Sequence, residues 1–299
     1  MQAFPPQCAI IAHHSSRERN RTATPKKDTM TTASEMTELN DGPNQEEPSD
    51  PNIMMSLVRG LTVIQAFSRQ ERSLTIAQIS QKTGIPRAAV RRCLYTLCAQ
   101  GFADCEDGRH YFLRPRILAL GHAYLTSSPL ARVAQPLLRR VSNELKESCS
   151  VAILDGEEIL YIARASVSRI MTIDLDIGSR LPAAYTSMGR VLLAGLTDQE
   201  LDRHLAELDP QAYTCHTLAN DGALRDEIMK VRAQGYAVID QELEIGLRSI
   251  AVPIRNGNGH VVAAINVGAP ASQVSADELT QRILPVLQAA AQEMSLFLV

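Results

Sequence analysis

The chain has 299 residues, of which 45% are hydrophobic, 21% are charged and six are cysteine. This length predicts two domains with apolar cores, and cysteines without a C-x-x-C pair predict neither a zinc site nor a disulfide framework. No run approaches the roughly 18 apolar residues of a membrane helix, and no signal-peptide core is present, so we expect a cytoplasmic protein rather than a membrane or secreted one.

Residues 1–52 are rich in Thr, Ser, Asn, Pro and acidic residues and show almost no apolar periodicity. A segment of this composition cannot bury enough apolar surface to fold, so we predict a disordered arm. Met30, Met36 and Met54 leave open a later start, and with it whether the arm belongs to the native protein.

The net charge of -3 is distributed unevenly along the chain. Residues 53–120 carry 10 Lys and Arg against 4 Asp and Glu, a balance of +6 between flanking segments at -3 and -6. One sign concentrated in one module indicates a polyanionic partner, with a solvated basic face as the alternative.

Three helices are predicted in this basic segment. The first starts near Ile53 and ends near Ser68, because apolar residues recur at spacings of three and four. A capping box at Thr75 starts the second, which ends at Gly84, and the third begins at Pro86.

The spacing of Ser80, Gly84 and Val90 is typical of a helix-turn-helix, with a small residue at the crossing, glycine in the turn and an apolar lock. This pattern places Cys93, Leu94 and Leu97 in the core beside Val90. Arginine in the first turn of a helix is mildly unfavourable, unless phosphates and guanine edges supply the missing negative charge. The predicted DNA-contacting positions of the third helix are Arg87, Ala88, Arg91, Arg92 and Tyr95.

A hairpin around Asp107-Gly108 follows and completes a winged helix-turn-helix domain at residues 53–115. Arg109 lies where a wing can reach phosphate or the minor groove, whereas His110 fits an ordinary solvated turn nearly as well. Residues 116–127 predict a linker helix that is apolar on more than one side, which indicates packing against a second copy.

Residues 128–299 predict a second domain of α+β class, an antiparallel sheet flanked by helices. The predicted helices are 129–148, 187–208, 221–235 and one from about Asp277. The predicted strands are a hairpin at 149–165 turning at Asp155-Gly156, single strands at 170–178 and 236–243, and a hairpin at 247–267 turning at Asn256-Gly257.

Three stretches together resemble the IclR family of bacterial transcription regulators: "LTIAQISQKTGIPRAAVRRCLYTL", "GSRLPAAYTSMGRVLLAGL" and "GYAVIDQELEIGLRSIAVPI". The resemblance runs from about Ile53 to the C-terminus. It is strongest to the branch that controls protocatechuate, 4-hydroxybenzoate and β-ketoadipate degradation. It implies a DNA-binding dimer or tetramer whose C-terminal domain, a relative of the GAF sensor fold, binds a small organic acid.

An effector site is expected where "AYTSMGR" begins a helix, because free N–H groups and the hydroxyls of Thr186 and Ser187 suit a carboxylate. The alternative is that either hydroxyl only caps the helix. Arg248 can pair with a ligand carboxylate or form an internal salt bridge with Glu242 or Glu244. The resemblance implies effector contacts from Ser187, Met188, Asp240, Ser249, Asn266 and Gly268, although some family members have Cys at the position of Ser249 and Ser at the last two.

An enzyme is not expected, because no G-x-S-x-G, H-E-x-x-H or Walker-type motif occurs, and the histidines have no partner at ligand spacing. A winged helix used only for protein contacts would not need the +6 balance. These observations favour a DNA-binding regulator without metal or cofactor, and the resemblance implies that it controls aromatic catabolism. Its expected partners are a double-stranded DNA operator, a small organic acid, further copies of itself and RNA polymerase, and the sequence leaves activation and repression equally open.

Overall fold

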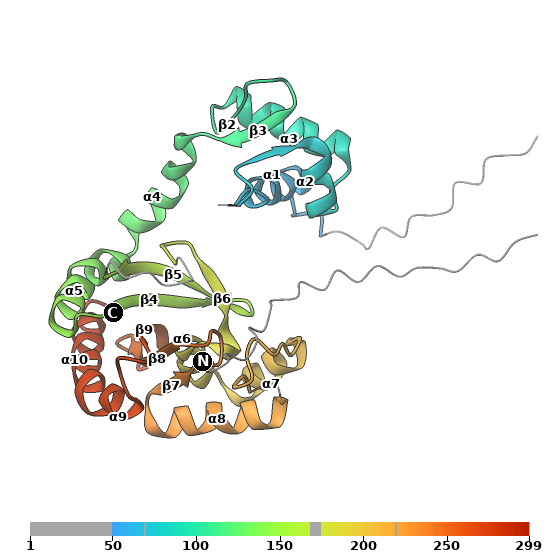
Figure 1. The fold of residues 1–299 in the computed structure, drawn as a ribbon. Helices are drawn as coiled ribbons and strands as arrows, with labels where there is room; N and C mark the ends of the chain where they lie inside the picture. Colours follow the sequence, from blue (N-terminus) through green and yellow to red (C-terminus); the bar gives the residue numbers. More distant parts are fainter. Residues whose placement is uncertain (1–49, 69, 168–174, 219, 299) are drawn as a thin grey trace, which may run out of the picture. The chain divides into compact units, whose positions relative to one another are not determined.

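The computed structural model describes residues 50–298 except 69, 168–174 and 219 (Figure 1). The predicted arm therefore lies outside the described residues except for its last three. The described chain forms two sets of elements with separate apolar cores, and each set is considered by itself.

The first set has three helices and a small antiparallel sheet with strand order β1-β3-β2. This arrangement is the predicted winged helix-turn-helix, followed by the linker helix α4. Within this first set, β1 is the strand that was not predicted, and it leads directly into α2. The elements are α1 (Met55–Gln65), β1 (Ser73–Thr75), α2 (Ile76–Thr83), α3 (Arg87–Ala99), β2 (Ala103–Cys105), β3 (His110–Leu113), a 3-10 turn (Pro115–Ile117) and α4 (Leu118–Ser127).

Local signals fix the helix-turn-helix. Thr75 Oγ1 accepts the Gln78 N–H at 3.3 Å, and the Gln78 side chain accepts the Thr75 N–H at 2.9 Å, which is the predicted capping box. Gly84 ends α2 with a φ of 71°, a left-handed conformation that favours glycine. Val90 and Leu94 are fully buried, so α3 is held against α1 and α2 by its apolar side.

The second set contains the large sheet, whose strand order is β6-β5-β4-β9-β8-β7 with every neighbouring pair antiparallel. Its class is the predicted α+β. The strands are β4 (Ser148–Asp155), β5 (Glu158–Ala165), β6 (Arg180–Pro182), β7 (Ala237–Asp240), β8 (Leu247–Arg255) and β9 (Val261–Pro270). The helices are α5 (Pro129–Leu145), a 3-10 turn (Ala183–Tyr185), α6 (Ser187–Ala194), α7 (Asp198–Glu207), α8 (Asp221–Gln234), α9 (Ala276–Glu278), a π turn (Leu279–Ile283) and α10 (Leu284–Ser295).

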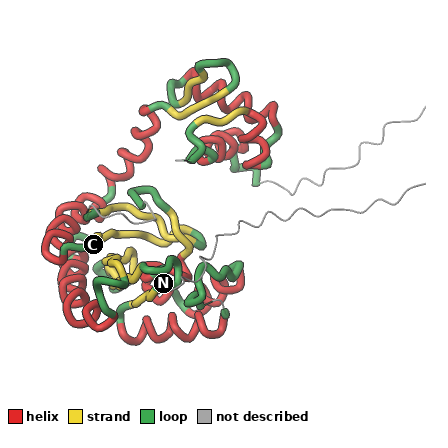
Figure 2. Tube along the Cα trace, in the orientation of Figure 1, coloured by secondary structure: helices red, strands yellow, loops and turns green. Residues whose placement is uncertain are grey.

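Helices cover both faces of this sheet (Figure 2). Because side chains alternate along a strand, Ile250 packs with α5 and α10 on one face, while Ala251 packs with α6 and α8 on the other. The 3-10 turn and α6 lie close against the second face, since a Cβ on Gly189 would stand 2.0 Å from the carbonyl oxygen of Ala183. Only glycine fits at that position.

Several boundaries differ from the predictions. The strand predicted at 170–178 falls partly outside the described residues, and its described part, 175–178, is not a strand, whereas β6 follows at Arg180. The helix predicted at 187–208 is interrupted, because Thr197 caps a separate helix, α7. The turn at 256–260 has its left-handed residue at Gly259 rather than Gly257. The terminal helix contains a π turn before Pro285, which has no N–H for a regular helical bond.

Candidate DNA interface and ligand cavity

The outer side of α3 is open to solvent. All five predicted contact residues are exposed, and Tyr95 is 77% exposed. Within the described part of the chain, no ion pair involves Arg87, Arg91 or Arg92. Cys93, predicted as core, is half-buried at the edge of a groove between α1 and α3. The arginines of α3 are therefore available for an external anion.

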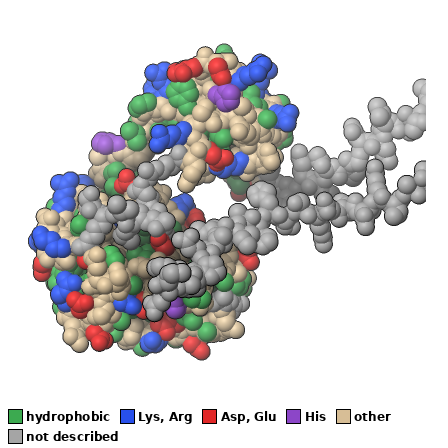
Figure 3. Space-filling view, viewed as in Figure 1, with side chains coloured by type: hydrophobic (Ala, Val, Ile, Leu, Met, Phe, Trp, Pro, Cys, Tyr) green, Lys and Arg blue, Asp and Glu red, His purple; other side chains and the backbone are tan. Residues whose placement is uncertain are grey.

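The start of α3 adds to this positive surface. Pro86 is the N-cap residue and has no side chain that could accept the first N–H groups, and no acidic residue occupies the first turn. Unsatisfied N–H groups at a helix start attract phosphate. Lys and Arg side chains also appear at several places on the visible face of the unit that contains α3 (Figure 3).

The two basic residues of the wing turn, Arg109 and His110, differ in their contacts. The Asp107 carboxylate accepts the N–H groups of Arg109 and His110 at 2.9 and 2.7 Å and contacts the His110 ring. These hydrogen bonds, above all the one from the His110 side chain, hold the pKa of Asp107 well below its usual range. His110 thus contributes to the turn itself, whereas the exposed Arg109 side chain remains free to reach a phosphate.

A cavity of about 50 Å³ lies in the second set of elements, where the sheet faces the 3-10 turn and the start of α6. Strand pairing brings its polar residues together: Arg164 lies opposite Ser150, and Ser150 lies opposite Asn266 on the next strand. In the neighbouring row, Gly268 lies opposite both Ser148 and Ser249. Four strands thus contribute one polar surface to the cavity.

Arg164 is the one cation among the described residues that line this cavity. Its Nη1 donates to Ser150 Oγ at 3.0 Å, while its Nε is buried and has no hydrogen-bond partner among the described residues. The Oδ1 atom of Asn266 is likewise buried and unpaired. Burial raises the pKa of the nearby Tyr161 to about 12, so its phenol stays neutral. A buried polar atom without a partner is costly, and a ligand with a carboxylate and a hydroxyl group would satisfy both.

Four of the predicted effector residues line the cavity: Thr186, Ser249, Asn266 and Gly268. Thr186 also caps α6, because its Oγ1 accepts the Gly189 N–H at 3.0 Å. Ser187 is 1% exposed, and its buried hydroxyl has no hydrogen-bond partner in the part of the chain that the structure describes.

Met188, Asp240 and Arg248 lie elsewhere. Met188 is fully buried in the apolar core on this side of the sheet. Arg248 donates to both carboxylate oxygens of Asp240 at 2.9 and 2.7 Å and to the Val274 carbonyl at 2.7 Å. Its guanidinium lowers the pKa of Asp240. The ion-pair partner of Arg248 is thus Asp240, across the base of the β7–β8 hairpin, rather than Glu242 or Glu244.

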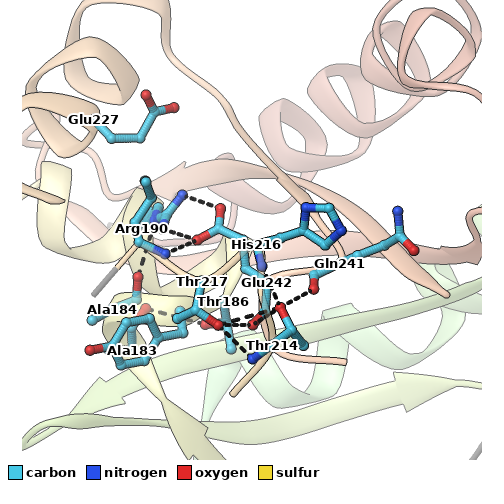
Figure 4. A network of polar contacts seen from close by, with 12 residues as sticks. Ala183, Ala184, Thr186, Arg190, Thr214, His216, Thr217, Glu227, Gln241 and Glu242 are labelled. Atoms are coloured by element: carbon cyan, nitrogen blue, oxygen red, sulfur yellow. Dashed lines mark hydrogen bonds and ion pairs between the residues drawn. The ribbon is translucent and has the colours of Figure 1, made fainter. Parts of the chain in front are cut away.

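Glu242 pairs instead with Arg190 of α6. The two arginine nitrogens donate to the two carboxylate oxygens at 2.8 and 2.6 Å, and Arg190 Nε donates to the Ala184 carbonyl at 3.0 Å. Figure 4 shows the Arg190 side chain extended toward the Glu242 carboxylate, with Thr214 and Thr217 beside the backbone of this segment. Arg190 is 1% exposed and Glu242 is 7% exposed, so this is a buried ion pair.

Arg164, Ser150 and Tyr161 line the cavity but were not among the residues predicted from the sequence. A usable signal was present in "SCSVA" and "YIARA", where serine and arginine interrupt strands that are otherwise apolar. Polar residues on the inner face of a sheet indicate a polar cavity. Whether these polar side chains lie next to one another depends on the register between the strands, which neither stretch determines by itself.

The described residues contain no group of three or more His, Cys, Asp or Glu side chains arranged to hold a metal ion. Among them, too, no helix combines the length and apolar character needed to cross a bilayer.

Comparison with known proteins assigns both parts of the chain. Residues 56–104 match the model of the IclR helix-turn-helix domain, and residues 122–296 match that of the bacterial transcriptional regulator IclR C-terminal domain. The Pca regulon regulatory protein of Pseudomonas putida is 54% identical over 82% of this chain and 84% of its own length.

Solved structures agree. A transcriptional regulator from Rhodococcus sp. RHA1 is 46% identical, with a TM-score of 0.73 over 82% of this chain and 98% of its own. A double mutant of the PobR inducer-binding domain from Acinetobacter, in complex with 3-hydroxybenzoic acid, is 27% identical, with a TM-score of 0.52 over 55% of this chain and 96% of its own.

Proposed function

This chain belongs to the IclR family of bacterial transcriptional regulators, and we propose that it controls genes of aromatic catabolism in response to a small acid. The effector is a carboxylated aromatic or its dicarboxylic breakdown product, with protocatechuate, 4-hydroxybenzoate and β-ketoadipate as the candidates. The observation that carries the proposal is the incompletely bonded Arg164 in a cavity lined by hydroxyl groups. The hydroxybenzoate bound to the PobR domain has this chemistry.

The DNA-binding surface is the exposed side of α3 together with Arg109 of the wing. Arginine reads guanine through paired hydrogen bonds in the major groove, and phosphate contacts set the register of the helix on the duplex. In this proposal Arg87 and Arg91 reach base edges, Arg92 and Arg109 contact phosphates, and Ala88 and Tyr95 complete the surface. This assignment accounts for a cation-rich helix start that the helix dipole alone disfavours.

In the cavity the effector carboxylate takes the free hydrogen-bonding capacity of Arg164, next to Ser150. A hydroxyl or keto oxygen lies toward Asn266, Ser249 and Thr186. Leucines and tyrosines of the lining cover the apolar part of the ligand. Arg248 and Asp240 form an ion pair with each other between β7 and β8 and do not contact the ligand in this proposal.

The functional unit is a homodimer or tetramer in the cytoplasm, with RNA polymerase as a further partner at the promoter. No residue of α4 is buried, and Leu118 and Leu120 are 70% and 52% exposed. Leu57 and Leu61 of α1 are also exposed beside an apolar groove. Since one helix reads too few base pairs for a specific site, a second copy covers these surfaces and the operator carries two half-sites.

Two measurements on the full-length protein test this function. Isothermal titration calorimetry with each of the three acids should give binding to at least one. A gel shift with the DNA upstream of the protein's own gene should show a complex whose stability changes in the presence of that acid, with a coupling of about 1 to 3 kcal/mol. Heat from none of the acids would overturn the effector class, and absence of a specific DNA complex would overturn the regulator role.

A further inference from the structure

The cavity is too small for the ligands that its chemistry suits. Its volume is about 50 Å³, whereas an apolar cavity of roughly 150 Å³ is known to accommodate benzene. An aromatic acid is larger than benzene, so one wall must move outward when it enters.

The segment 241–247 is the wall best able to move. Leu243 lines the cavity from the middle of this segment and Leu247 from its far end, where β8 begins and pairs with Pro270. Residues 241–246 connect β7 to β8 without belonging to either strand. Its first residue, Gln241, has a φ of 62°, which is unfavourable for a residue other than glycine. The opposite side of the cavity consists largely of the paired strands β4, β5, β8 and β9.

Side-chain contacts centred on Glu242 hold this segment in place. Beyond the bidentate pair with Arg190, the Glu242 carbonyl accepts the hydroxyl groups of Thr217 at 2.6 Å and Thr214 at 3.2 Å. The carboxylate also accepts the Leu218 N–H at 3.2 Å. Other hydrogen bonds hold the two ends of the segment: Thr214 Oγ1 donates to the Gln241 carbonyl at 2.8 Å, and the Ala271 N–H donates to the Gly246 carbonyl at 2.8 Å. Without the contacts of Glu242, the middle of segment 241–247, which carries Leu243, would be the part held least.

Arg190 connects the moving wall to the fixed one. It lies in the first turns of α6, whose cap residue Thr186 lines the cavity, and it also bonds the Ala184 carbonyl just before that cap. A buried ion pair is rarely the most stabilising choice for a core position, but it defines one specific arrangement of the segments that carry it.

We propose that the Arg190–Glu242 pair is a latch that keeps segment 241–247 closed over the effector cavity and so sets the rate at which effector enters and leaves. Arg190 and Glu242 are thus positioning residues that act through Leu243 and Leu247. The entry-rate part of this inference rests on the proposed function, whereas the closure of the segment is measurable without any ligand.

Hydrogen exchange on the full-length protein without ligand tests the closure. The reporters are the Gly246 N–H, which donates to Gln241 Oε1 at 3.0 Å, and the Leu247 N–H, which donates to the Glu244 carbonyl at 3.1 Å. In Glu242→Gln, which keeps the shape but removes the charge, exchange in 241–247 should rise about tenfold while β9 stays protected. Arg190→Lys, which keeps the charge but loses the paired geometry, should shift the same peptides in the same direction.

Stopped-flow binding of protocatechuate, 4-hydroxybenzoate and β-ketoadipate tests the rate. With a latch, Glu242→Gln raises both the association and the dissociation rate constant several-fold, because opening precedes entry. With a merely structural pair, only dissociation accelerates. The matched control is Asp202→Asn, which removes the exposed pair between Asp202 and Arg225 on α7 and α8 and should change neither rate.

The outcomes separate the two proposals. Unchanged exchange in 241–247, or exchange that rises equally throughout the domain, overturns the latch, as does an unchanged association rate for a ligand that binds. If none of the three acids binds the wild-type protein, the effector class fails, and the exchange experiment still decides whether segment 241–247 is latched.

Discussion

Replacing Arg164 by glutamine removes the only cation that lines the cavity among the described residues. Glutamine retains a hydrogen-bond donor for Ser150, so the strands β4 and β5 should keep their pairing. The ligand carboxylate, however, loses its charged partner. The variant therefore isolates the contribution of charge to effector binding.

The magnitude follows from the bonds at stake. Within the described structure, the Arg164 guanidinium bonds Ser150 and its buried Nε has no partner, so a bound carboxylate would gain at least one charge-assisted hydrogen bond. Hydrogen bonds to charged groups contribute about 1.5 to 3 kcal/mol. Since 1.4 kcal/mol is a factor of ten, the dissociation constant should rise about 10- to 100-fold.

Calorimetry with a matched ligand pair makes the assay specific. Wild-type protein should prefer 4-hydroxybenzoate to 4-hydroxybenzamide, which has the same shape without the charge, and Arg164→Gln should abolish that preference while binding the amide about as well as before. Arg225→Gln removes an exposed arginine of α8 and should change neither affinity. If Arg164→Gln binds acid and amide with equal losses, the residue is structural and the proposed carboxylate site is refuted.

Three further predictions concern the rest of the chain. Arg87→Ala and Arg91→Ala should each weaken specific DNA binding by about 1 to 3 kcal/mol in a gel shift, and binding should fall steeply with salt; a double variant with wild-type affinity would exclude α3 from base contact. Leu118→Glu should reduce the amount of oligomer detected by light scattering, because this 70% exposed leucine is proposed to face a second copy. A wild-type protein that is monomeric while bound to DNA would contradict the proposed assembly. Gly189→Ala should lower the free energy of unfolding by about 3 kcal/mol or more, because the new Cβ would stand 2.0 Å from a backbone oxygen; a thermal melting temperature equal to that of the wild type would show that the turn before α6 can yield.

The sequence predicted the elements whose signals are local. The capping box at Thr75, the left-handed Gly84 and the turn glycines Gly108 and Gly156 all appear as expected. Each depends on a few consecutive residues and on backbone geometry that glycine alone adopts readily. The winged helix-turn-helix and the antiparallel pairing of the second sheet could therefore be predicted from the sequence.

Only some of the cavity's residues could be predicted from the sequence, because the cavity depends on contacts between distant parts of the chain. Arg164, Ser150 and Asn266 lie in one row because two strand registers coincide. The strands β4 and β5 are joined by a tight turn, but β9 begins more than 100 residues after β4 ends. No local pattern encodes the register between β4 and β9. The same holds for Arg248, whose pairing with Asp240 follows from the cross-strand geometry of one hairpin rather than from charge alone.

The buried Arg190 and the half-buried Arg164 differ in how completely they are bonded among the described residues, and our proposals for their roles rest on that difference. Arg190 donates to Glu242 and to a backbone carbonyl through all three of its nitrogens, so it has little capacity left for a ligand. Among the described residues, Arg164 has one side-chain bond, to a neutral hydroxyl, and an unpaired buried Nε, an arrangement that a bound anion would relieve. Since the two side chains share no hydrogen-bond partner among the described residues, we expect the affinity for the effector to depend mainly on Arg164 and the rate of its exchange mainly on Arg190.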